Sequence, residues 1–525
     1  MATARVVAHR LSYPTSRPVV VTALSAAACV ALLALIVWPL ATVIATGIVQ
    51  ASRVGVRMPF EVLARTLILA AVSTALTVLV AATVAYAIVR AGVAGSGLAH
   101  RLLSVGLVLP PFLPGLAVLL LSGGRAGVAA LVVAQVLSFL PHAYLALANA
   151  LAALHRDQED VAEILGAGRI RILSRITLVL LRPGLVSASC VVALLCLSDF
   201  VNPVLVGGDY TVLAPFVFVA ATRSADAGFA AGLTLWLVAP CLALAALGRW
   251  RAAAAFEVRP TPSPPHRPPP AALGIVTGAV SATLLAVYAS VAVGAIVTAW
   301  GGDWTPTLRH LAGTVSDHGR ALGGSVAIAI AAAVGGTLLA LLVAGVVTRG
   351  GIAGAVVEYA SLLPAAVPPL VLGLGFLLAY APSPLDLAAA ALLSAAAVVA
   401  ARLPVAAQAA IAAVRGLDAD VVLVARSLGA DRRRVFARVL APLLTPVAAS
   451  ILAYLFVRAL IAVSAVVLLA GPRVPLASLK AIDVALAGRT GEACALAVAL
   501  SVMVLVVVGL RRTLPGREHA AVWFL

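Results

Sequence analysis

The sequence has little charge and almost no lysine. Only 10% of its 525 residues are charged and 63% are hydrophobic, whereas a soluble domain is roughly half apolar and about a quarter charged. The one lysine, Lys480, follows Leu479, so the chain has no phosphate-binding loop of the G-x4-GK[ST] type. These scarcities exclude a soluble domain and a P-loop ATPase.

Other patterns typical of reactive sites are missing as well. The sequence has no CxxC pair, no His-x-Glu metal motif, no G-x-S-x-G nucleophile turn and no paired carboxylates at a membrane face. His142 and His155 stand alone. The five cysteines lie within or beside apolar runs, where packing explains them: Cys29, Cys190, Cys196, Cys241 and Cys494. We therefore expect no enzyme activity in this chain, no metal site and no cofactor.

Long apolar runs dominate what is present. A helix needs about 20 apolar residues to cross the hydrocarbon core of a bilayer, and twelve such runs can be marked. The first six lie near 20–49, 66–89, 102–122, 126–150, 184–206 and 229–248. The second six lie near 273–299, 325–348, 355–381, 386–412, 446–470 and 493–510. We expect the first run to stay as an uncleaved helix, because it is about twice as long as a signal-peptide core.

A proline-rich stretch separates the two sets of runs. Residues 249–272 contain the run from Pro260 to Pro270, which can neither continue a helix nor bury apolar surface. The sequence therefore predicts a repeat at 1–248, a cytoplasmic linker at 249–272 and a second repeat at 273–525.

The positive charges are sorted by membrane side. If the N-terminus is inside, 24 of the 36 Lys and Arg residues lie in segments on the inner face, as the positive-inside rule expects. Those segments are 1–19, 90–101, 155–182, 249–272, 349–354, 413–445 and 511–525. Anionic lipid accounts for much of the net charge of +17, so we expect membrane lipid and no nucleic acid as a partner.

The two halves repeat each other most clearly in one loop. Residues 154–183 match 417–446 at a constant offset of 263, with 13 identities in 30 positions. The matched residues include acidic, glycine, arginine and proline positions: Asp157/Asp420, Val161/Val424, Ala162/Ala425, Leu165/Leu428, Gly166/Gly429, Ala167/Ala430, Arg169/Arg432, Arg171/Arg434, Arg175/Arg438 and Pro183/Pro446. We call residues 155–182 the first loop and 417–445 the second loop.

Each loop is predicted to be a helix-turn-helix. An acidic residue lies near the start of a short helix, a glycine ends that helix, and a basic amphipathic helix follows. A single copy would also fit a basic surface segment lying on lipid. The two copies lie at equivalent places, and six spans per half put both on the same membrane face. This favours parallel repeats that dock two like partner subunits on that face.

The loops resemble the EAA motif of type I ABC importer permeases, EAA-x3-G-x9-I-x-L-P. The first loop has Asp160-Val161-Ala162-x3-Gly166; the second has Val424-Ala425-x3-Gly429, with Leu423 where the motif has Glu. The resemblance implies an all-α polytopic membrane protein in which each motif forms a coupling helix in a groove of an ATP-binding subunit. It implies two such ATPase subunits on the cytoplasmic face and an extracytoplasmic substrate-binding protein as partners.

Two further segments resemble the fused permeases of ferric-iron importers. One is Leu197-Ser-Asp199-Phe-Val-Asn202-Pro, with Val201 where that group usually has glycine; the other is Phe456-Val-Arg458 through Ser464-Ala-Val. The resemblance implies ferric iron as substrate. Fused permeases for thiamine and for phosphonates share the two-half layout, so both remain alternatives.

Asp199 and Arg458 are charges within predicted spans, where charges are costly and usually face a partner or a watery cavity. We expect Asp199, Asn202, Arg458 and Ser464 to line or gate the pathway, with Asp199 and Arg458 as partners. The alternatives are a buried structural ion pair, or an Arg458 satisfied by backbone carbonyls. Arg402, before Leu403-Pro404, is given a structural role where the helix bends.

A secondary transporter driven by an ion gradient is the rival from another class. It needs intramembrane acids or broken helices for coupling, and the predicted spans hold few acids, mainly Asp199 and Glu358. It also does not predict the paired loops. The sequence therefore predicts alternating access in a multi-pass protein of a bacterial cytoplasmic membrane, with both termini inside.

Overall fold

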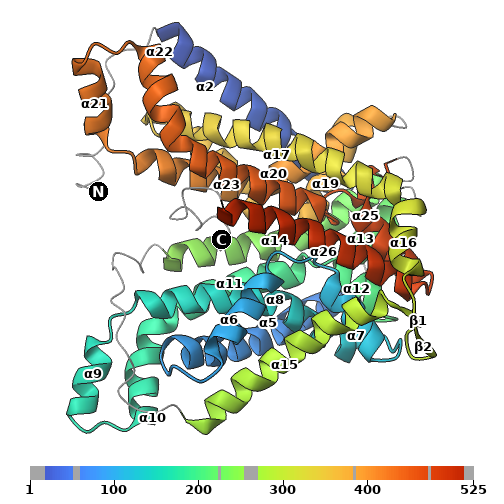
Figure 1. Ribbon diagram of the computed structural model, residues 1–525. Helices are drawn as coiled ribbons and strands as arrows, with labels where there is room; N and C mark the ends of the chain where they lie inside the picture. The colour runs from blue at the N-terminus through green and yellow to red at the C-terminus, as the bar shows by residue number, and fades with distance from the viewer. Residues whose placement is uncertain are drawn as a thin grey trace. The chain divides into compact units, whose positions relative to one another are not determined.

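The computed structural model describes residues 18–50, 60–222, 226–252, 270–381, 386–470 and 474–513. Over these ranges the chain is helical apart from one short hairpin (Figure 1). Two compact units are present. Unit 1 draws on 1–50, 318–479 and 500–525, and unit 2 on 51–317 and 480–499.

Unit 2 holds fifteen elements of its own and part of two more. They are α5 (Phe60–Val89), α6 (Ser96–Gly106), α7 (Leu113–Leu121), α8 (Val128–Ala153), α9 (Asp157–Ile164), α10 (Arg169–Ile172), η2 (Leu173–Thr177), α11 (Leu178–Leu197), α12 (Val201–Val206), α13 (Leu213–Thr222), α14 (Ala227–Ala252), α15 (Ala271–Gly294), β1 (Val297–Ala299), β2 (Asp303–Pro306) and α16 (Arg309–Ser316). Helix α25 (Ala477–Leu486) and helix α26 (Thr490–Thr513) are divided between the units.

Unit 1 holds the remaining elements. They are α2 (Pro18–Leu32), η1 (Leu33–Val37), α3 (Trp38–Val49), α17 (Gly319–Val347), α18 (Gly351–Leu362), η3 (Leu363–Ala366), α19 (Pro369–Tyr380), α20 (Leu387–Arg415), α21 (Ala419–Ser427), α22 (Arg432–Val435), η4 (Phe436–Leu440), α23 (Ala441–Leu460) and α24 (Val467–Ala470). The segments η1, η2 and η4 are π-helices, and η3 is a 3-10 turn.

The compact units exchange the first helix of each sequence half. Helices α2 and α3 open the first half of the chain, yet they pack on α17, α18 and α19 in unit 1. Helix α15 opens the second half and packs on α5, α6 and α7 in unit 2. The repeat boundaries at 1–248 and 273–525 remain a prediction. Residues 253–269 of the predicted linker lie outside the described residues.

Ten helices within the described ranges are long and apolar enough to cross a membrane, or eleven if one bent pair counts as a span. The ten are Ala23–Val49, Phe60–Val89, Val128–Ala153, Arg169–Leu197, Ala227–Gly248, Ala271–Gly294, Gly319–Val347, Leu387–Arg415, Arg433–Leu460 and Thr490–Arg511. The all-α polytopic class is confirmed. The sequence prediction of twelve continuous spans is corrected at the third span of each half.

Both third spans are broken at prolines. The run predicted at 102–122 is divided between α6 and α7, with Pro110 and Pro114 beside the break. The run predicted at 355–381 consists of α18 and α19, bent by 112° at Pro364 and Pro368. Proline lacks an N–H and disfavours helical backbone in the residue before it, which explains why the helix is interrupted at equivalent places.

A short hairpin follows α15 in unit 2. Strands β1 and β2 are antiparallel, pairing Val297 with Pro306 and Ala299 with Asp303. The rings of Trp300 and Trp304 lie 5.0 Å apart, and the Trp300 indole donates to the Leu120 carbonyl at 3.0 Å. The hairpin is therefore tied to the end of α7, and α16 continues from it.

Candidate functional site

The first loop is a helix-turn-helix, as predicted. Helix α9 has three acidic residues in its first turn, where carboxylates suit the positive end of the helix dipole. Gly166 ends it with φ +83°, a left-handed conformation that glycine adopts without strain. The chain then turns at Gly168 into α10. Asp160, Val161 and Ala162 of the predicted motif all lie on α9.

The second loop has the same conformation with different caps. The Asp418 side chain accepts from the Asp420 N–H at 2.9 Å and caps α21, and Gly429 ends the helix with φ +81°. Asp431 accepts from the Arg434 N–H at 2.9 Å and caps α22. Val424 and Ala425 lie on α21. The two glycines therefore make the same turn in both copies.

A π-helix joins each loop to the span that follows. It occupies Leu173–Thr177 in the first copy and Phe436–Leu440 in the second, positions that differ by the same 263 residues as the sequence repeat. The fifth and eleventh spans therefore begin at Arg169 and Arg433, earlier than the predicted starts at 184 and 446. Pro183 and Pro446, which lie at those predicted starts, are inside α11 and α23, and both helices continue through them. Single π-turns in helices often occur at functional sites.

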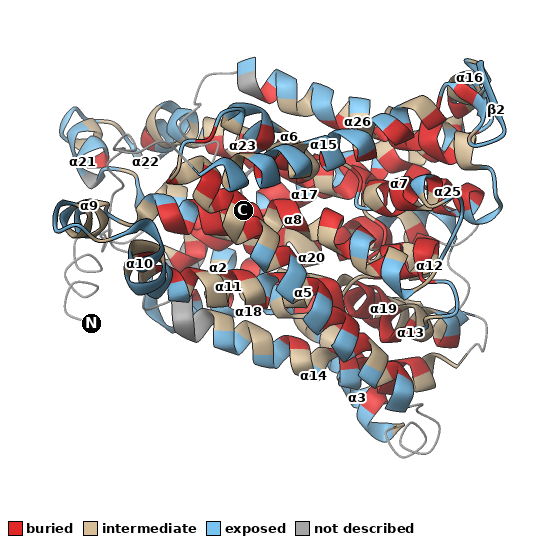
Figure 2. Ribbon diagram, turned by 90° about the horizontal axis from the view of Figure 1, so that it is seen from below, coloured by how far each residue is buried: buried red, intermediate tan, exposed pale blue. Residues whose placement is uncertain are grey.

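Each loop exposes the same apolar side chains. Leu165 is 80% exposed and its counterpart Leu428 is 81% exposed; Val161 and Val424 are 55% and 57% exposed. Figure 2 shows that α9 and α21 carry few buried residues. Matching exposure of large apolar side chains, outside the membrane-spanning helices, marks a surface suited to a protein partner.

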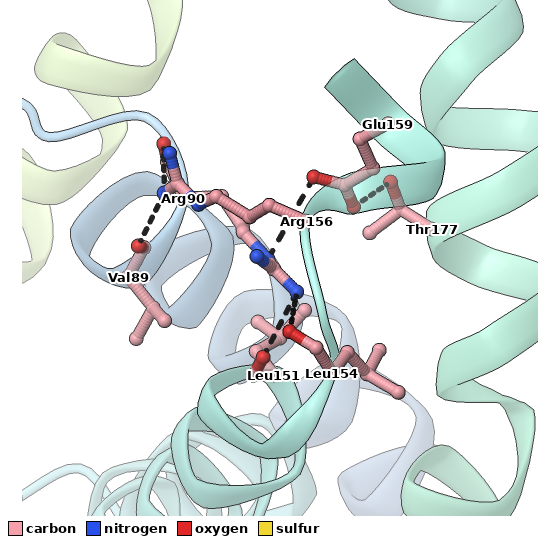
Figure 3. A network of polar contacts seen from close by, with 7 residues as sticks. All are labelled: Val89, Arg90, Leu151, Leu154, Arg156, Glu159 and Thr177. Carbon is pink, nitrogen blue, oxygen red and sulfur yellow. Dashed lines mark hydrogen bonds and ion pairs between the residues drawn. The ribbon is translucent and has the colours of Figure 1, made fainter. Parts of the chain in front are cut away.

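The first loop is tied to two long helices by a reciprocal pair of arginines (Figure 3). Arg90 follows α5, and its Nη2 donates to the carbonyls of Leu151 and Leu154 at 3.0 and 2.8 Å. Arg156 follows α8, and its Nη2 donates to the carbonyls of Val89 and Arg90 at 3.0 and 2.9 Å. Each arginine therefore donates to carbonyls at the end of the other helix, where main-chain partners run out; the Leu151 carbonyl also accepts from the Leu154 N–H.

Glu159 joins α9 to this arginine pair. Its Oε2 lies 3.9 Å from Arg90 Nε, and its Oε1 accepts from the Thr177 hydroxyl at 2.7 Å. Burial lowers the pKa of the Arg90 guanidinium and the Glu159 carboxylate opposes that effect. Thr177 is buried in the π-helix η2. One carboxylate thus contacts the end of α5 and the start of α11.

The second loop lacks this arrangement. At the offset of 263, Arg156, Glu159 and Thr177 correspond to Ala419, Val422 and Leu440. Val422 is buried on α21. Within the second loop Arg434 pairs with Asp431 at 4.0 Å, and just before the loop Arg415 pairs with Glu358 of α18 at 3.4 Å. The loops are therefore alike in conformation and in exposed face but unlike in how they are attached.

Asp199 lies at the break between α11 and α12, in a polar cluster. Its carboxylate accepts from Gln135 Nε2 at 3.1 Å, from Asn202 Nδ2 at 2.9 Å and from the N–H groups of Val201 and Asn202. Asn202 also donates to Ser138 at 3.1 Å. Four donors from unit 2 therefore hold the carboxylate at the start of α12.

Arg458 lies on α23 in unit 1. Its guanidinium carbon is 5.7 Å from the centre of the Tyr454 ring, and Arg402 donates a side-chain hydrogen bond to the same tyrosine. Ser464 follows in the turn between α23 and α24, where it is half-buried. Two intramembrane arginines therefore meet at Tyr454. The predicted partnership of Asp199 with Arg458 joins residues of different units and stays a prediction.

Sequence reasoning missed the polar contacts that attach the first loop. The sequence marks Arg90 and Arg156 only as positive charges on the inner face, and no motif marks Glu159 or Thr177. The one signal available was their difference from the second copy, where each matched position beyond Arg90 carries an apolar residue. Gln135, which donates to Asp199, and Tyr454, which contacts Arg458, belong to no motif in the sequence.

Comparison with known proteins agrees with the paired architecture. The family model described as binding-protein-dependent transport system inner membrane component matches residues 77–253 and again 336–513. The chain is 26% identical over 416 residues to the ferric transport system permease protein FbpB of Actinobacillus pleuropneumoniae, covering 71% of this chain and 60% of that protein. It is 26% identical over 396 residues to the putative ferric transport system permease protein FbpB 1 of Haemophilus influenzae, covering 69% and 63%.

The aligned region thus spans a little under two thirds of these relatives' length. The two family matches together cover more than half of the chain, and each includes one helix-turn-helix loop. The chain therefore belongs to the family of binding-protein-dependent transport system inner-membrane components.

Proposed function

We propose that this chain is the pore-forming subunit of an ATP-binding-cassette importer, and that its two loops dock two ATPase subunits on the cytoplasmic face. The observation that carries the proposal is the pair of loops with equal turns at Gly166 and Gly429 and equal exposure at Leu165 and Leu428. A partner with a repeated apolar groove would bury both faces in the same way.

Ferric iron is the substrate that we propose first. The support is the similarity to two permeases named for ferric transport, together with the segments around Asp199 and Arg458. Among the residues that the structure describes, no three His, Cys, Asp or Glu side chains are grouped so as to hold a metal ion. Thiamine and phosphonates are the competing substrates, and direct uptake assays separate the three.

The translocation pathway is proposed to involve Asp199, Asn202, Arg458 and Ser464. Asn202 Oδ1 would lie 2.7 Å from a Cβ added to Gly115 of α7, so α7 and α12 pack tightly there. In unit 1, a Cβ added to Gly373 of α19 would lie 2.6 Å from the Ala465 carbonyl. In each unit the helix after the proline break therefore packs against a segment that carries candidate pathway residues.

The mechanism that follows is alternating access. An extracytoplasmic binding protein delivers substrate, closure of the ATPases moves the two loops, and the long helices rock to open the pathway inward. Helices α10 to α11 and α22 to α23 continue from each loop into a span. Movement of a loop is thereby passed directly to a membrane helix.

Co-purification with the ATPase tests the docking role. Leu165→Arg and Leu428→Arg, alone and together, place a charge on each exposed face; because both side chains are about 80% exposed, the fold should tolerate them. We expect wild type to bring an ATPase out of a gentle detergent extract and the double variant to lose it.

The matched control is Val315→Arg, an exposed valine on α16 near the hairpin of unit 2. This variant should recover the ATPase like wild type. A folded wild-type chain that brings no ATPase, with uptake driven by an ion gradient, would contradict the proposal and support the secondary transporter.

A further inference from the structure

The arginine pair and Glu159 give the first loop an attachment that the second loop does not have. Arg90 is buried and donates to the end of α8, while Arg156 donates to the end of α5. A hydrogen bond from a charged donor is stronger than one between neutral groups. The ends of α5 and α8 are therefore fixed to each other, and α9 begins directly from this junction.

Glu159 is the contact through which α9 acts on that junction. It faces Arg90 from one side and Thr177 of the π-helix from the other (Figure 3). The Glu159–Arg90 separation of 3.9 Å is an ion pair without a hydrogen bond, and Arg90 Nε is a buried donor with no hydrogen-bond partner. A shift of α9 toward α5 by about 1 Å would turn this ion pair into a charge-assisted hydrogen bond.

Resting on the proposed function, we infer that Glu159 is a positioning residue that passes movement of the first loop to α5, α8 and α11 at once. The second loop continues into α23 and carries Val422 and Leu440 at the matched positions, so no carboxylate there can take the place of Glu159. The two loops are therefore unequal in coupling, although both dock an ATPase. The first loop links ATP hydrolysis to the rearrangement of three membrane helices.

The test compares ATP hydrolysis with uptake in the complete importer reconstituted in liposomes. Glu159→Gln keeps an oxygen that accepts from Thr177 and removes the charge that faces Arg90. We expect the ATPase to stay bound, hydrolysis to remain within about twofold, and the ATP consumed per substrate to rise about tenfold, within the usual range of coupling energies. Loss of folded protein lowers both rates together and leaves their ratio unchanged.

Two further variants separate coupling from folding. Thr177→Val removes the hydroxyl that binds Glu159 and should raise the same ratio, whereas Thr177→Ser keeps the hydroxyl and should restore it. The matched control is Glu358→Gln, which removes the carboxylate of the Glu358–Arg415 pair and should leave the ratio at the wild-type value.

Failure of the coupling role of Glu159 and failure of the proposed function give different results. If the ATPase is recovered and the ratio is unchanged in Glu159→Gln and in Thr177→Val, the coupling role of Glu159 is wrong and the proposed function stands. A ratio raised equally by Glu358→Gln also overturns the inequality of the loops. If wild type recovers no ATPase, the proposed function fails and this inference fails with it.

Discussion

Arg90 and Arg156 each follow one helix and cap the other. Arg90 directly follows α5 and donates to carbonyls at the end of α8, while Arg156 directly precedes α9 and donates to carbonyls at the end of α5. Because the first loop begins at this junction, its position is fixed by main-chain carbonyls of two membrane helices.

Removal of Arg90 is expected to destabilise the protein strongly. Arg90→Ala leaves the Leu154 carbonyl without its donor and the Leu151 carbonyl with only the Leu154 N–H, which costs about 1–3 kcal/mol. Arg65→Ala removes the exposed ion pair with Glu61 and should cost about 0–1 kcal/mol. Thermal unfolding in detergent, monitored as the loss of monodisperse protein, gives a midpoint for each variant, and we expect the midpoint of Arg90→Ala to be the lower one. Equal midpoints for both would contradict the capping role of Arg90.

We expect Gly166 and Gly429 to be needed for their left-handed backbone conformation, and not because a side chain there would clash with a neighbour. A Cβ at Gly166 or Gly429 meets nothing within 4 Å, yet both residues have φ near +80°. Alanine there should cost about 1–2 kcal/mol of local strain and speed amide hydrogen exchange in α9 or α21. The control Gly168→Ala, at an ordinary φ of −69°, should leave exchange unchanged. The same acceleration in the control would show that left-handed strain is not the cause.

Tight packing between α7 and α12 predicts a sensitive glycine. Gly115→Ala brings a Cβ to 2.7 Å from Asn202 Oδ1, so buried neighbours must shift at a cost of about 1–3 kcal/mol. We expect lower uptake together with a lower unfolding midpoint. Gly97→Ala on α6 meets open space and should stabilise the helix slightly. If Gly115→Ala behaves like Gly97→Ala, the packing at Asn202 is looser than described.

Asp199 is expected to be required for uptake and not for docking. Asp199→Asn replaces a carboxylate oxygen with an NH2 group, which cannot accept the hydrogen bonds that Gln135 and Asn202 donate. Loss of such a network costs about 1–3 kcal/mol. Uptake should fall about tenfold or more while the ATPase is still recovered. Arg458→Gln, which loses the charge beside Tyr454, should have a similar effect. Normal uptake in both variants would remove these residues from the pathway.

The spans and loops could be predicted from the sequence because each depends on a local pattern. Apolar runs gave the long helices, and the identities around Gly166 and Gly429 gave two helix-turn-helix loops. The breaks beside Pro110 and Pro364 were within reach of the same reasoning. Paired prolines mark both breaks, but each apolar run is long enough to predict a single span.

The remaining features depend on contacts between distant parts of the chain. The exchange of α2 and α15 between the compact units follows no sequence period. The contacts of Arg90 are with main-chain carbonyls, which any residue supplies, so no side-chain pattern marks them. The same holds for Asn202 against Gly115. Such features appear only when the packing of the helices is known.

The most direct test of the account is uptake by the purified chain reconstituted in liposomes with the ATPase and binding protein that accompany it. We predict that ferric iron enters only when ATP and the binding protein are both present, with no requirement for an ion gradient, and that Leu165→Arg with Leu428→Arg abolishes uptake. Uptake that follows an ion gradient and ignores ATP would contradict the central claim.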